Sequence, residues 1–136
     1  MVDRLPKDAG EYTEGLQSIL DRMNARRAVW VGIDCDAGWY PILVQLDKDI
    51  AALHPDYEVY QVKEKFGGLR YYIGGTPQEV TVEVHKLISE AESLSLVTCE
   101  LCGEPGTLRD QRWVRTLCDA HKDYKPVLDW DQYDRN

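Results

Sequence analysis

The sequence predicts an α+β fold in which three helices pack against a small antiparallel β-hairpin sheet, followed by a short segment organised by paired cysteine and histidine residues. Three observations lead to this prediction. Apolar residues recur at helical spacing in three stretches, residues 57–74 are rich in strand formers around two glycines, and Cys-x2-Cys and Cys-x2-His pairs follow the last helix.

The first helix is expected from about residue 8 to residue 26, because its apolar residues share one face. Asp8 and Glu11 have the spacing of a capping box at its start. Val29, Val31 and Ile33 then alternate with other residues, which predicts a short strand. The apolar helix positions are Tyr12, Leu16, Ile19, Leu20 and Met23.

A second helix is expected over residues 40–53, with Pro41 in its first turn and Pro55 shortly after its end. Its expected buried stripe is Trp39, Leu43, Leu46, Ile50 and Leu53. Residues 57–74 then predict a β-hairpin, in which Gly67-Gly68 supplies the turn because glycine tolerates a positive φ.

The third helix has a predicted cap at Thr76, proline at its first position and Glu79 in a capping box. Its 3.6-residue period over four turns outweighs the β-branched residues in it. Its expected apolar face is Val80, Val84, Leu87, Ile88, Ala91 and Leu94.

The chain has 136 residues, of which 24 are acidic and 16 basic, and its net charge is −8. This acidic balance argues against a general nucleic-acid-binding protein, which is typically basic. No run of about 18 apolar residues predicts a membrane helix, and the polar first residues do not resemble a secretory signal. We therefore expect a cytoplasmic protein with reduced cysteines.

Four residues after the third helix have the spacing of metal ligands. Cys99 and Cys102 form a Cys-x2-Cys pair, and Cys118 and His121 form a Cys-x2-His pair after fifteen intervening residues. Two residues between paired ligands allow both side chains to point at one ion. Gly103 can adopt the left-handed conformation that directs backbone N–H groups toward the thiolates.

The segment between the ligand pairs fits a treble-clef-like zinc finger. Leu108-Arg109 and residues 113–117 can form a short hairpin, and the second ligand pair would begin a short helix that ends before Pro126. Three thiolates and one imidazole fill a tetrahedral shell, so we expect one structural Zn²⁺ ion. Iron is an open alternative. A redox Cys-x2-Cys pair would leave the second ligand pair unexplained.

These patterns divide the chain into three parts. Residues 1–98 form the α+β body, residues 99–128 form the zinc finger packed on the body, and residues 129–136 form a C-terminal tail. The tail combines acidic and aromatic residues, and it is either a docking peptide or a frayed terminus.

Five stretches of the chain resemble an uncharacterised family of small bacterial and phage proteins. They are residues 38–41, 61–72, 91–93, 99–106 and 115–121, and they include a QVKEKFG-x-LR strand pair and a CExCG…RTLCD-x-H finger. The resemblance covers roughly residues 36 to 122. It implies a bacterial or phage origin inside the cell and a metal-bound finger, and it implies no reaction.

Basic and aromatic residues form a candidate binding patch. In an extended strand, Lys63 and Lys65 lie on the same side as Val59, and Arg70 and Tyr72 follow on the returning strand. The finger adds Arg109, Arg112 and Arg115. Such a surface can bind single-stranded nucleic acid. The alternative is a solvated strand face paired with Glu58 and Glu64.

A catalytic site has less support, and no catalytic residue is assigned. Cys35 lies between Asp34 and Asp36 in the loop 34–39, where neighbouring carboxylates raise the pKa of a thiol and reduce its nucleophilicity. The favoured hypothesis is therefore a zinc-binding protein-interaction module, phage- or prophage-encoded, that regulates a host factor. The alternatives are a nucleic-acid-binding protein and an enzyme using the loop 34–39.

Overall fold

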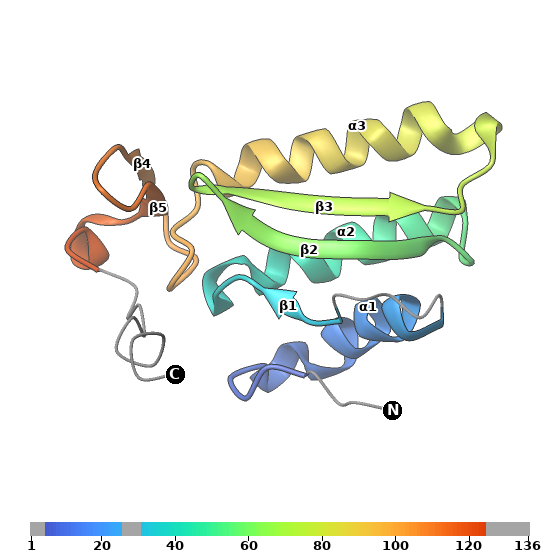
Figure 1. The fold of residues 1–136 in the computed structure, drawn as a ribbon, viewed down its shortest axis with the longest axis horizontal. Helices are drawn as coiled ribbons and strands as arrows, with labels where there is room; N and C mark the ends of the chain where they lie inside the picture. The colour runs from blue at the N-terminus through green and yellow to red at the C-terminus, as the bar shows by residue number, and fades with distance from the viewer. Residues whose placement is uncertain (1–4, 26–30, 125–136) are drawn as a thin grey trace, which may run out of the picture.

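The computed structural model describes residues 5–25 and 31–124, which form a mixed α/β fold with two small sheets (Figure 1). The helices of this part are α1 (Thr13–Ala25), α2 (Tyr40–Leu53) and α3 (Gln78–Ser95), with 3-10 turns η1 (Gly10–Tyr12), η2 (Ala37–Trp39) and η3 (Asp119–His121). The strands are β1 (Ile33–Asp34), β2 (Glu58–Lys65), β3 (Gly68–Gly74), β4 (Thr107–Arg109) and β5 (Arg115–Leu117).

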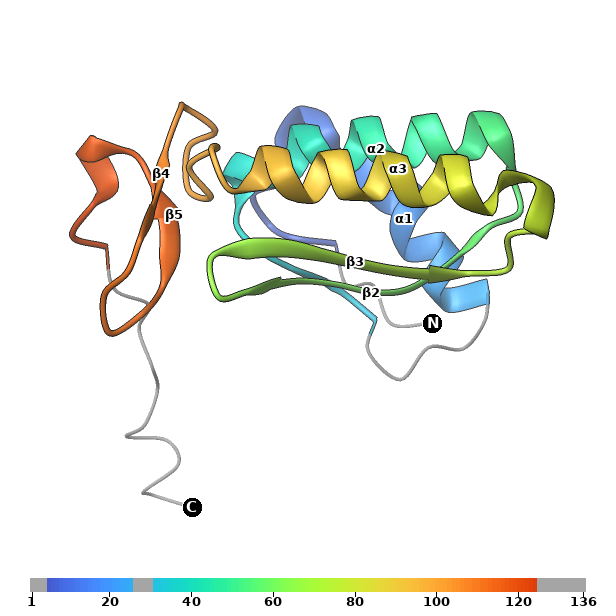
Figure 2. The same ribbon diagram turned by 90° about the horizontal axis from the view of Figure 1, so that it is seen from above.

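The larger sheet has the order β1-β2-β3, and all three helices cover one of its faces (Figure 2). Helix α1 contacts β2 and α2, whereas α3 contacts β3 and α2. The β4–β5 hairpin lies at the end of this body where the β2–β3 turn and the last turn of α3 meet. No described element covers the other face of the larger sheet.

The larger sheet is mixed and contains β1 besides the predicted hairpin, which corrects the expected antiparallel hairpin sheet. Strand β1 pairs parallel to β2, with Ile33 opposite Val62, because α2 forms the crossover between them. The alternation of Val29, Val31 and Ile33 predicts a strand here, but two paired residues carry no signal of the partner strand or of its direction. Val29, predicted for the same strand, lies outside the described residues.

The β2–β3 hairpin is present as predicted, but its turn lies one residue earlier. Lys65 pairs with Gly68, so the turn residues are Phe66 and Gly67, with φ values of +53° and +83°. Positive φ at both positions is the pattern of a type I′ turn, whose twist matches that of the strands. Gly68 is therefore the first residue of β3 and not a turn residue.

A bulge in β2 corrects the expected orientation of its side chains. The register shifts between Val59 and Gln61, so Val59 is buried while Lys63 and Lys65 lie on the opposite, outer face. A strict alternation had placed Val59 on the lysine side. The extra residue cannot be read from the sequence because both strand segments keep their strand-forming composition.

Helix α3 closes the free edge of β3. The backbone N–H of Leu69 donates to the Ser95 hydroxyl at 2.9 Å, and that of Tyr71 donates to the Glu92 carboxylate at 3.3 Å. These N–H groups point away from β2 and would otherwise be open to a further strand. The body therefore does not present the β3 edge for strand addition.

The core between helices and sheet contains one buried polar cluster. The Asp47 carboxylate accepts hydrogen bonds from Tyr57, from Ser18 at 2.9 Å and from the Arg22 guanidinium at 2.8 Å. The hydroxyl oxygens of Tyr57 and Tyr71 lie 2.8 Å apart. Burial, with the neighbouring hydroxyl and carboxylate, raises the pKa of Tyr57 well above its usual value, and burial also raises that of Tyr71.

Both predicted capping boxes are wrong. Gly10 has a φ of +52°, so the chain enters α1 through a 3-10 turn and not through a continuous helix from residue 8. The N-cap of α3 is Pro77, which is extended and makes no side-chain hydrogen bond. The Pro77 carbonyl accepts the Thr81 hydroxyl at 3.0 Å and the Val80 N–H at 3.1 Å. The helix thus begins one residue later than the cap predicts.

The helical stripes are largely as predicted, with exceptions at their ends. Leu43, Leu46 and Ile50 are buried in α2, whereas Leu53 is exposed. In α3, Val84 and Ala91 are buried and Leu94 is exposed. Both exposed leucines belong to the last turns of their helices.

Candidate metal centre

The structure brings the four predicted ligands together. Cys99 and Cys102 lie in the loop after α3, Cys118 follows β5, and His121 ends η3. Their ligand atoms all lie within 4.8 Å of one another. The β4–β5 hairpin makes this possible, because its antiparallel strands bring Cys118 and His121 back to Cys99 and Cys102.

The separations within this cluster fit a tetrahedral metal site. The Sγ atoms of Cys102 and Cys118 are 3.7 Å apart, as are Cys99 Sγ and His121 Nδ1, and Cys118 Sγ lies 3.2 Å from the same Nδ1. Zinc bond lengths give tetrahedral edges of about 3.8 Å between sulfurs and about 3.6 Å between sulfur and nitrogen. All four cysteines are free thiols. The donor set is therefore compatible with a metal ion such as zinc.

The loop around Cys99 directs backbone donors at its sulfur. The N–H of Gly103 donates to the Cys99 carbonyl at 2.9 Å, and Gly103 has a φ of +83°, as predicted for this turn. Burial raises the pKa of the Cys99 thiol, but N–H groups of Cys118, Cys102 and Leu101 outweigh it and lower this pKa to about 6. A thiol that ionises this readily is a good metal ligand.

The same loop disfavours a redox function for the Cys-x2-Cys pair. The pair follows the end of α3, whereas redox pairs of this kind sit at the start of a helix. Cys118 and His121 also complete the cluster, which a dithiol pair would not require.

The metal cluster is attached to the body through Gly38, a position that the sequence did not single out as structural. Its N–H donates to the Glu100 carbonyl at 2.7 Å. A Cβ on Gly38 would lie 2.1 Å from the carbonyl oxygen of Cys99, which is closer than atoms can approach. Only glycine therefore allows the body to contact the ligand loop this closely.

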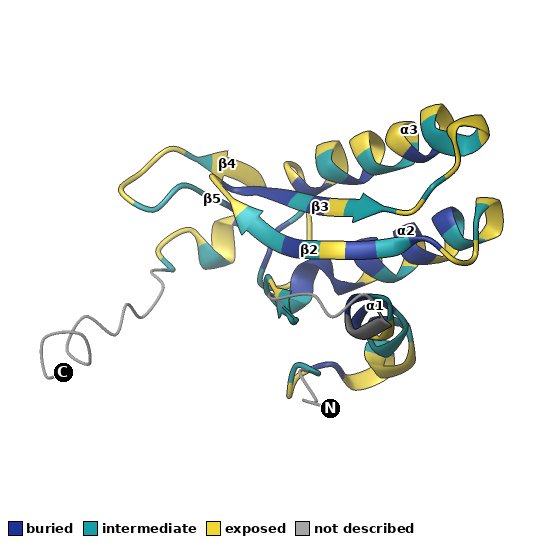
Figure 3. Cartoon of the chain, turned by 45° about the vertical axis from the view of Figure 1, so that its right-hand side comes forward, coloured by how far each residue is buried: buried dark blue, intermediate teal, exposed yellow. Residues whose placement is uncertain are grey.

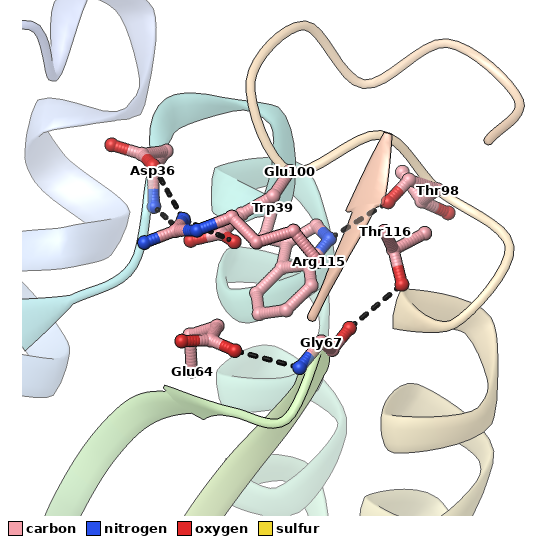
Figure 4. A network of polar contacts seen from close by, with 8 residues as sticks. All are labelled: Asp36, Trp39, Glu64, Gly67, Thr98, Glu100, Arg115 and Thr116. Carbon is pink, nitrogen blue, oxygen red and sulfur yellow. Dashed lines mark hydrogen bonds and ion pairs between the residues drawn. The ribbon is translucent and has the colours of Figure 1, made fainter. Parts of the chain in front are cut away.

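A buried ion pair lies beside this contact (Figure 4). Glu100 is 1% exposed, and its carboxylate accepts hydrogen bonds from the Arg115 guanidinium at 2.8 Å and from the Asp36 N–H at 3.1 Å. Arg115 also pairs with the Asp36 carboxylate at 3.2 Å. Burial raises the pKa of Glu100 to about 7 although Arg115 opposes this shift.

Three further hydrogen bonds complete the junction shown in Figure 4. The indole N–H of Trp39 donates to the Thr98 carbonyl at 2.9 Å, and the buried Thr116 hydroxyl donates to the Gly67 carbonyl at 2.7 Å. The Glu64 carboxylate accepts the Gly67 N–H at 2.6 Å. Four stretches that carry the sequence resemblance, 38–41, 61–72, 99–106 and 115–121, thus meet at one place.

The seven residues of the predicted binding patch do not form one surface. Lys63, Lys65, Arg70 and Tyr72 lie together on the outer face of the larger sheet. Arg115 is part of the buried ion pair, and Arg109 binds Asp119 at 2.9 Å and the Leu117 carbonyl at 3.2 Å. Arg112 is exposed near Trp113, with its guanidinium carbon 5.9 Å from the ring centroid. Side-chain partners decided this division, and no sequence spacing reveals them.

The loop 34–39 contains no arrangement that would activate Cys35. This thiol is largely enclosed, and burial together with Glu100, Asp36 and Asp34 raises its pKa well above the usual value. A protonated thiol is a weak nucleophile.

The chain matches no family profile, no curated protein and no solved structure. The resemblance to small bacterial and phage proteins therefore stays a prediction. Within the described residues, no helix has both the length and the apolar character needed to cross a membrane. The C-terminal tail 129–136 and the last finger residues, 125–128, lie outside that part of the chain.

Proposed function

We propose that the chain is a zinc-stabilised interaction module of the bacterial cytoplasm whose partner is another protein. The donor set supports a structural ion, because three thiolates and one imidazole fill a tetrahedral shell and leave no position for water or substrate. The ion would supply folding free energy that a short segment with few buried side chains lacks. The treble-clef topology predicted from the sequence belongs to the same proposal.

An exposed apolar patch where the finger meets the body carries the proposal. Phe66 at the tip of the β2–β3 hairpin is 72% exposed, Leu108 in β4 is 49% exposed and Leu96 after α3 is 41% exposed. A Cβ on Gly67 would lie 2.4 Å from Leu108 Cδ1, and one on Gly68 would lie 3.2 Å from Leu96 Cδ2. We call Phe66, Leu96 and Leu108 the junction patch. Contiguous exposed apolar side chains mark protein-binding sites.

Nucleic-acid binding has weaker support. Lys63, Lys65 and Arg70 remain available on the outer sheet face, but Arg109 and Arg115 bind partners within the chain. The net charge of the chain is −8, and this negative charge repels a long polyanion despite the remaining cations. An enzyme using the loop 34–39 has less support again, because Cys35 holds its proton. The resemblance extends the protein-binding proposal to a phage- or prophage-encoded regulator of a host factor.

The metal is tested on the purified full chain by elemental analysis. We expect one zinc per chain, lost in a Cys118→Ser variant and kept in Cys35→Ser, which changes the cysteine outside the cluster. Iron in place of zinc would change the identity of the ion, and absence of any stoichiometric metal from both the wild type and Cys35→Ser would refute the structural role.

The partner is tested by affinity purification from bacterial lysate, with and without nuclease treatment. We expect the wild type and a Val82→Ser variant to capture a protein in stoichiometric amount. The variants Phe66→Ser and Leu108→Ser should lose this protein. Val82 is an exposed apolar residue of α3 and is the matched control. Capture of nucleic acid alone, lost on nuclease treatment, would favour the nucleic-acid alternative.

A further inference from the structure

We propose that the junction patch, with Lys65 and Arg70 beside it, binds an acidic segment of a protein partner that also presents an apolar side chain. We also propose that the metal site is needed to assemble this surface. The inference rests on the proposed function and goes beyond it in naming the surface and the chemistry of the partner.

The junction patch is composite. Phe66 belongs to the body hairpin, Leu96 to the end of α3, and Leu108 to β4 of the finger (Figure 1). The backbone of Gly67 and Gly68 lies beneath the two leucines, because neither glycine has a Cβ to hold them away. No single part of the chain carries the patch, and it is complete only while the finger is docked on the body.

The conformation of Phe66 is unusual for its residue type. Its φ of +53° lies in the left-handed region, where a bulky side chain is disfavoured, and it is the first of two turn positions that glycine or asparagine usually occupies. Its ring is 72% exposed, so burial does not offset this unfavourable conformation. A strained and exposed aromatic residue at a hairpin tip is well placed as an anchor for a partner.

Cations without acidic partners flank this anchor. Lys63 stands directly opposite Arg70 in the hairpin, and like charges in this position are destabilising. Lys65 Nζ lies 5.8 Å from the centroid of the Phe66 ring. Among the described residues, none of the three cations forms an ion pair. Glu64, the expected partner in the same strand, is bound to the turn backbone instead.

The Arg70 guanidinium connects the basic and apolar parts. A Cβ on Gly68 would lie 3.4 Å from Arg70 Nη1 and 3.2 Å from Leu96 Cδ2, so the guanidinium and the leucine both lie beside Gly68. A ligand that contacts Phe66 and Leu96 therefore also reaches Arg70. The cations therefore favour a ligand with carboxylates, and the junction patch favours a ligand with an apolar side chain close to them.

An acidic protein segment fits this surface better than a nucleic acid does. Leu96 and Leu108 offer aliphatic contacts, whereas single strands bind by stacking on aromatic rings and through an extended basic groove. The basic area is confined to one hairpin of an acidic chain, so a short segment avoids the surrounding negative charge that a long polyanion meets.

The test measures binding by the zinc-loaded full chain of three fluorescein-labelled probes. They are a peptide of Glu-Asp-Leu repeats, a polyglutamate of equal charge and an oligothymidylate of equal charge. We expect the Glu-Asp-Leu peptide to bind most tightly and to weaken with added salt. Equal or tighter binding of the oligothymidylate, or no preference for the leucine-containing peptide, would overturn the inference.

Variants locate the site. Phe66→Ala and Lys65→Glu are each expected to weaken the Glu-Asp-Leu peptide by about tenfold, whereas Val82→Ala and Lys86→Glu on α3 leave it unchanged. Circular dichroism of each variant confirms the fold before binding is measured. Equal losses in Lys86→Glu and Lys65→Glu would show a response to net charge only and would contradict a local site.

The metal requirement is tested with Cys118→Ser and with chelated wild type. Both are expected to lose binding of the Glu-Asp-Leu peptide while the helical circular dichroism of the body persists. Undiminished binding would show that Phe66 and the cations suffice and would overturn the metal requirement. A stoichiometric lysate partner together with failure of the peptide would refute the inference and leave the proposed function standing.

Discussion

The body and the finger reach their structures by different means. In the body, buried side chains from all three helices and the larger sheet form one continuous cluster. In the described part of the finger, the buried apolar cluster consists of Cys99, Leu117 and Cys118, two of which belong to the candidate metal site. Exposed and half-buried residues make up most of the β4–β5 hairpin in Figure 3. We therefore expect burial to be sufficient to order the body, whereas the finger should depend on its ligand cluster and on its contacts with the body.

This difference also explains the composition of the junction between them. A finger with a small core cannot be positioned by apolar packing, and Glu100, Arg115 and Thr116 provide specific polar contacts instead. Gly38 allows the ligand loop to approach the body closely enough to make them. The junction thus links the metal site to the hairpin that carries Phe66.

Metal removal should have the largest effect and should separate the two regions. Chelation is expected to abolish the dispersed amide signals of residues 99–124 in a nuclear magnetic resonance spectrum, while those of α1, α2 and α3 remain. Structural zinc contributes about 10–16 kcal/mol of apparent binding free energy in isolated fingers. A finger that keeps its native signals without metal would show that burial and docking suffice.

Breaking the junction should have the next largest effect. Arg115→Ala leaves the Glu100 carboxylate buried without its cation, which we expect to lower the free energy of unfolding by about 3–5 kcal/mol. Arg112→Ala, on the same hairpin but exposed, is the control and should change it by less than about 0.5 kcal/mol. Urea denaturation measures both. Adding Glu100→Gln to Arg115→Ala should restore part of the lost free energy of unfolding. If it does not, the unpaired charge of Glu100 is not the cause of the loss.

Two leucine truncations should sharpen the contrast between the regions. Leu43→Ala in α2 is expected to cost about 2–5 kcal/mol in the unfolding of the body, because a large cavity remains among fixed neighbours. Leu117→Ala removes an equally buried side chain in the finger, which has fewer neighbours and can relax more. Leu117→Ala should accelerate zinc release, and it should lower the free energy of unfolding of the body by less than Leu43→Ala does. Equal effects on both readouts would mean that the two regions unfold as one unit.

Alkaline pH should destabilise the body through its buried tyrosines, and we expect this to be the smallest of the four effects. Burial raises the pKa of Tyr57 and of Tyr71, so both keep their protons in the folded chain, while the unfolded chain releases them near the ordinary tyrosine pKa of about 10. Above that pH the unfolded state binds fewer protons, so stability falls by about 1.4 kcal/mol per pH unit for each tyrosine. Urea midpoints between pH 9 and pH 11 measure this slope, and Tyr57→Phe should reduce it.

Several elements of both regions could be predicted because their signals are local. Helix α2 has the predicted bounds, since Pro41 and Pro55 mark its ends and the stripe through Leu43 and Ile50 has helical period. The four residues that cluster as candidate metal ligands were predicted from their spacing alone. The turn at Gly103 follows from the φ of +83° that only glycine adopts freely.

The chain by itself determined the elements, the core stripes and the ligand set, because each depends on residues close in sequence. Tertiary structure decided the parallel pairing of β1, the bulge in β2, the turn at Phe66 and the partners of Arg115. These features depend on which backbone and side-chain groups meet across long separations. Arg115 was predicted as a surface cation, and its burial follows from the position of Glu100, which docking at Gly38 fixes. A charge pattern shows that a cation is present, whereas only the folded chain shows which acid binds it.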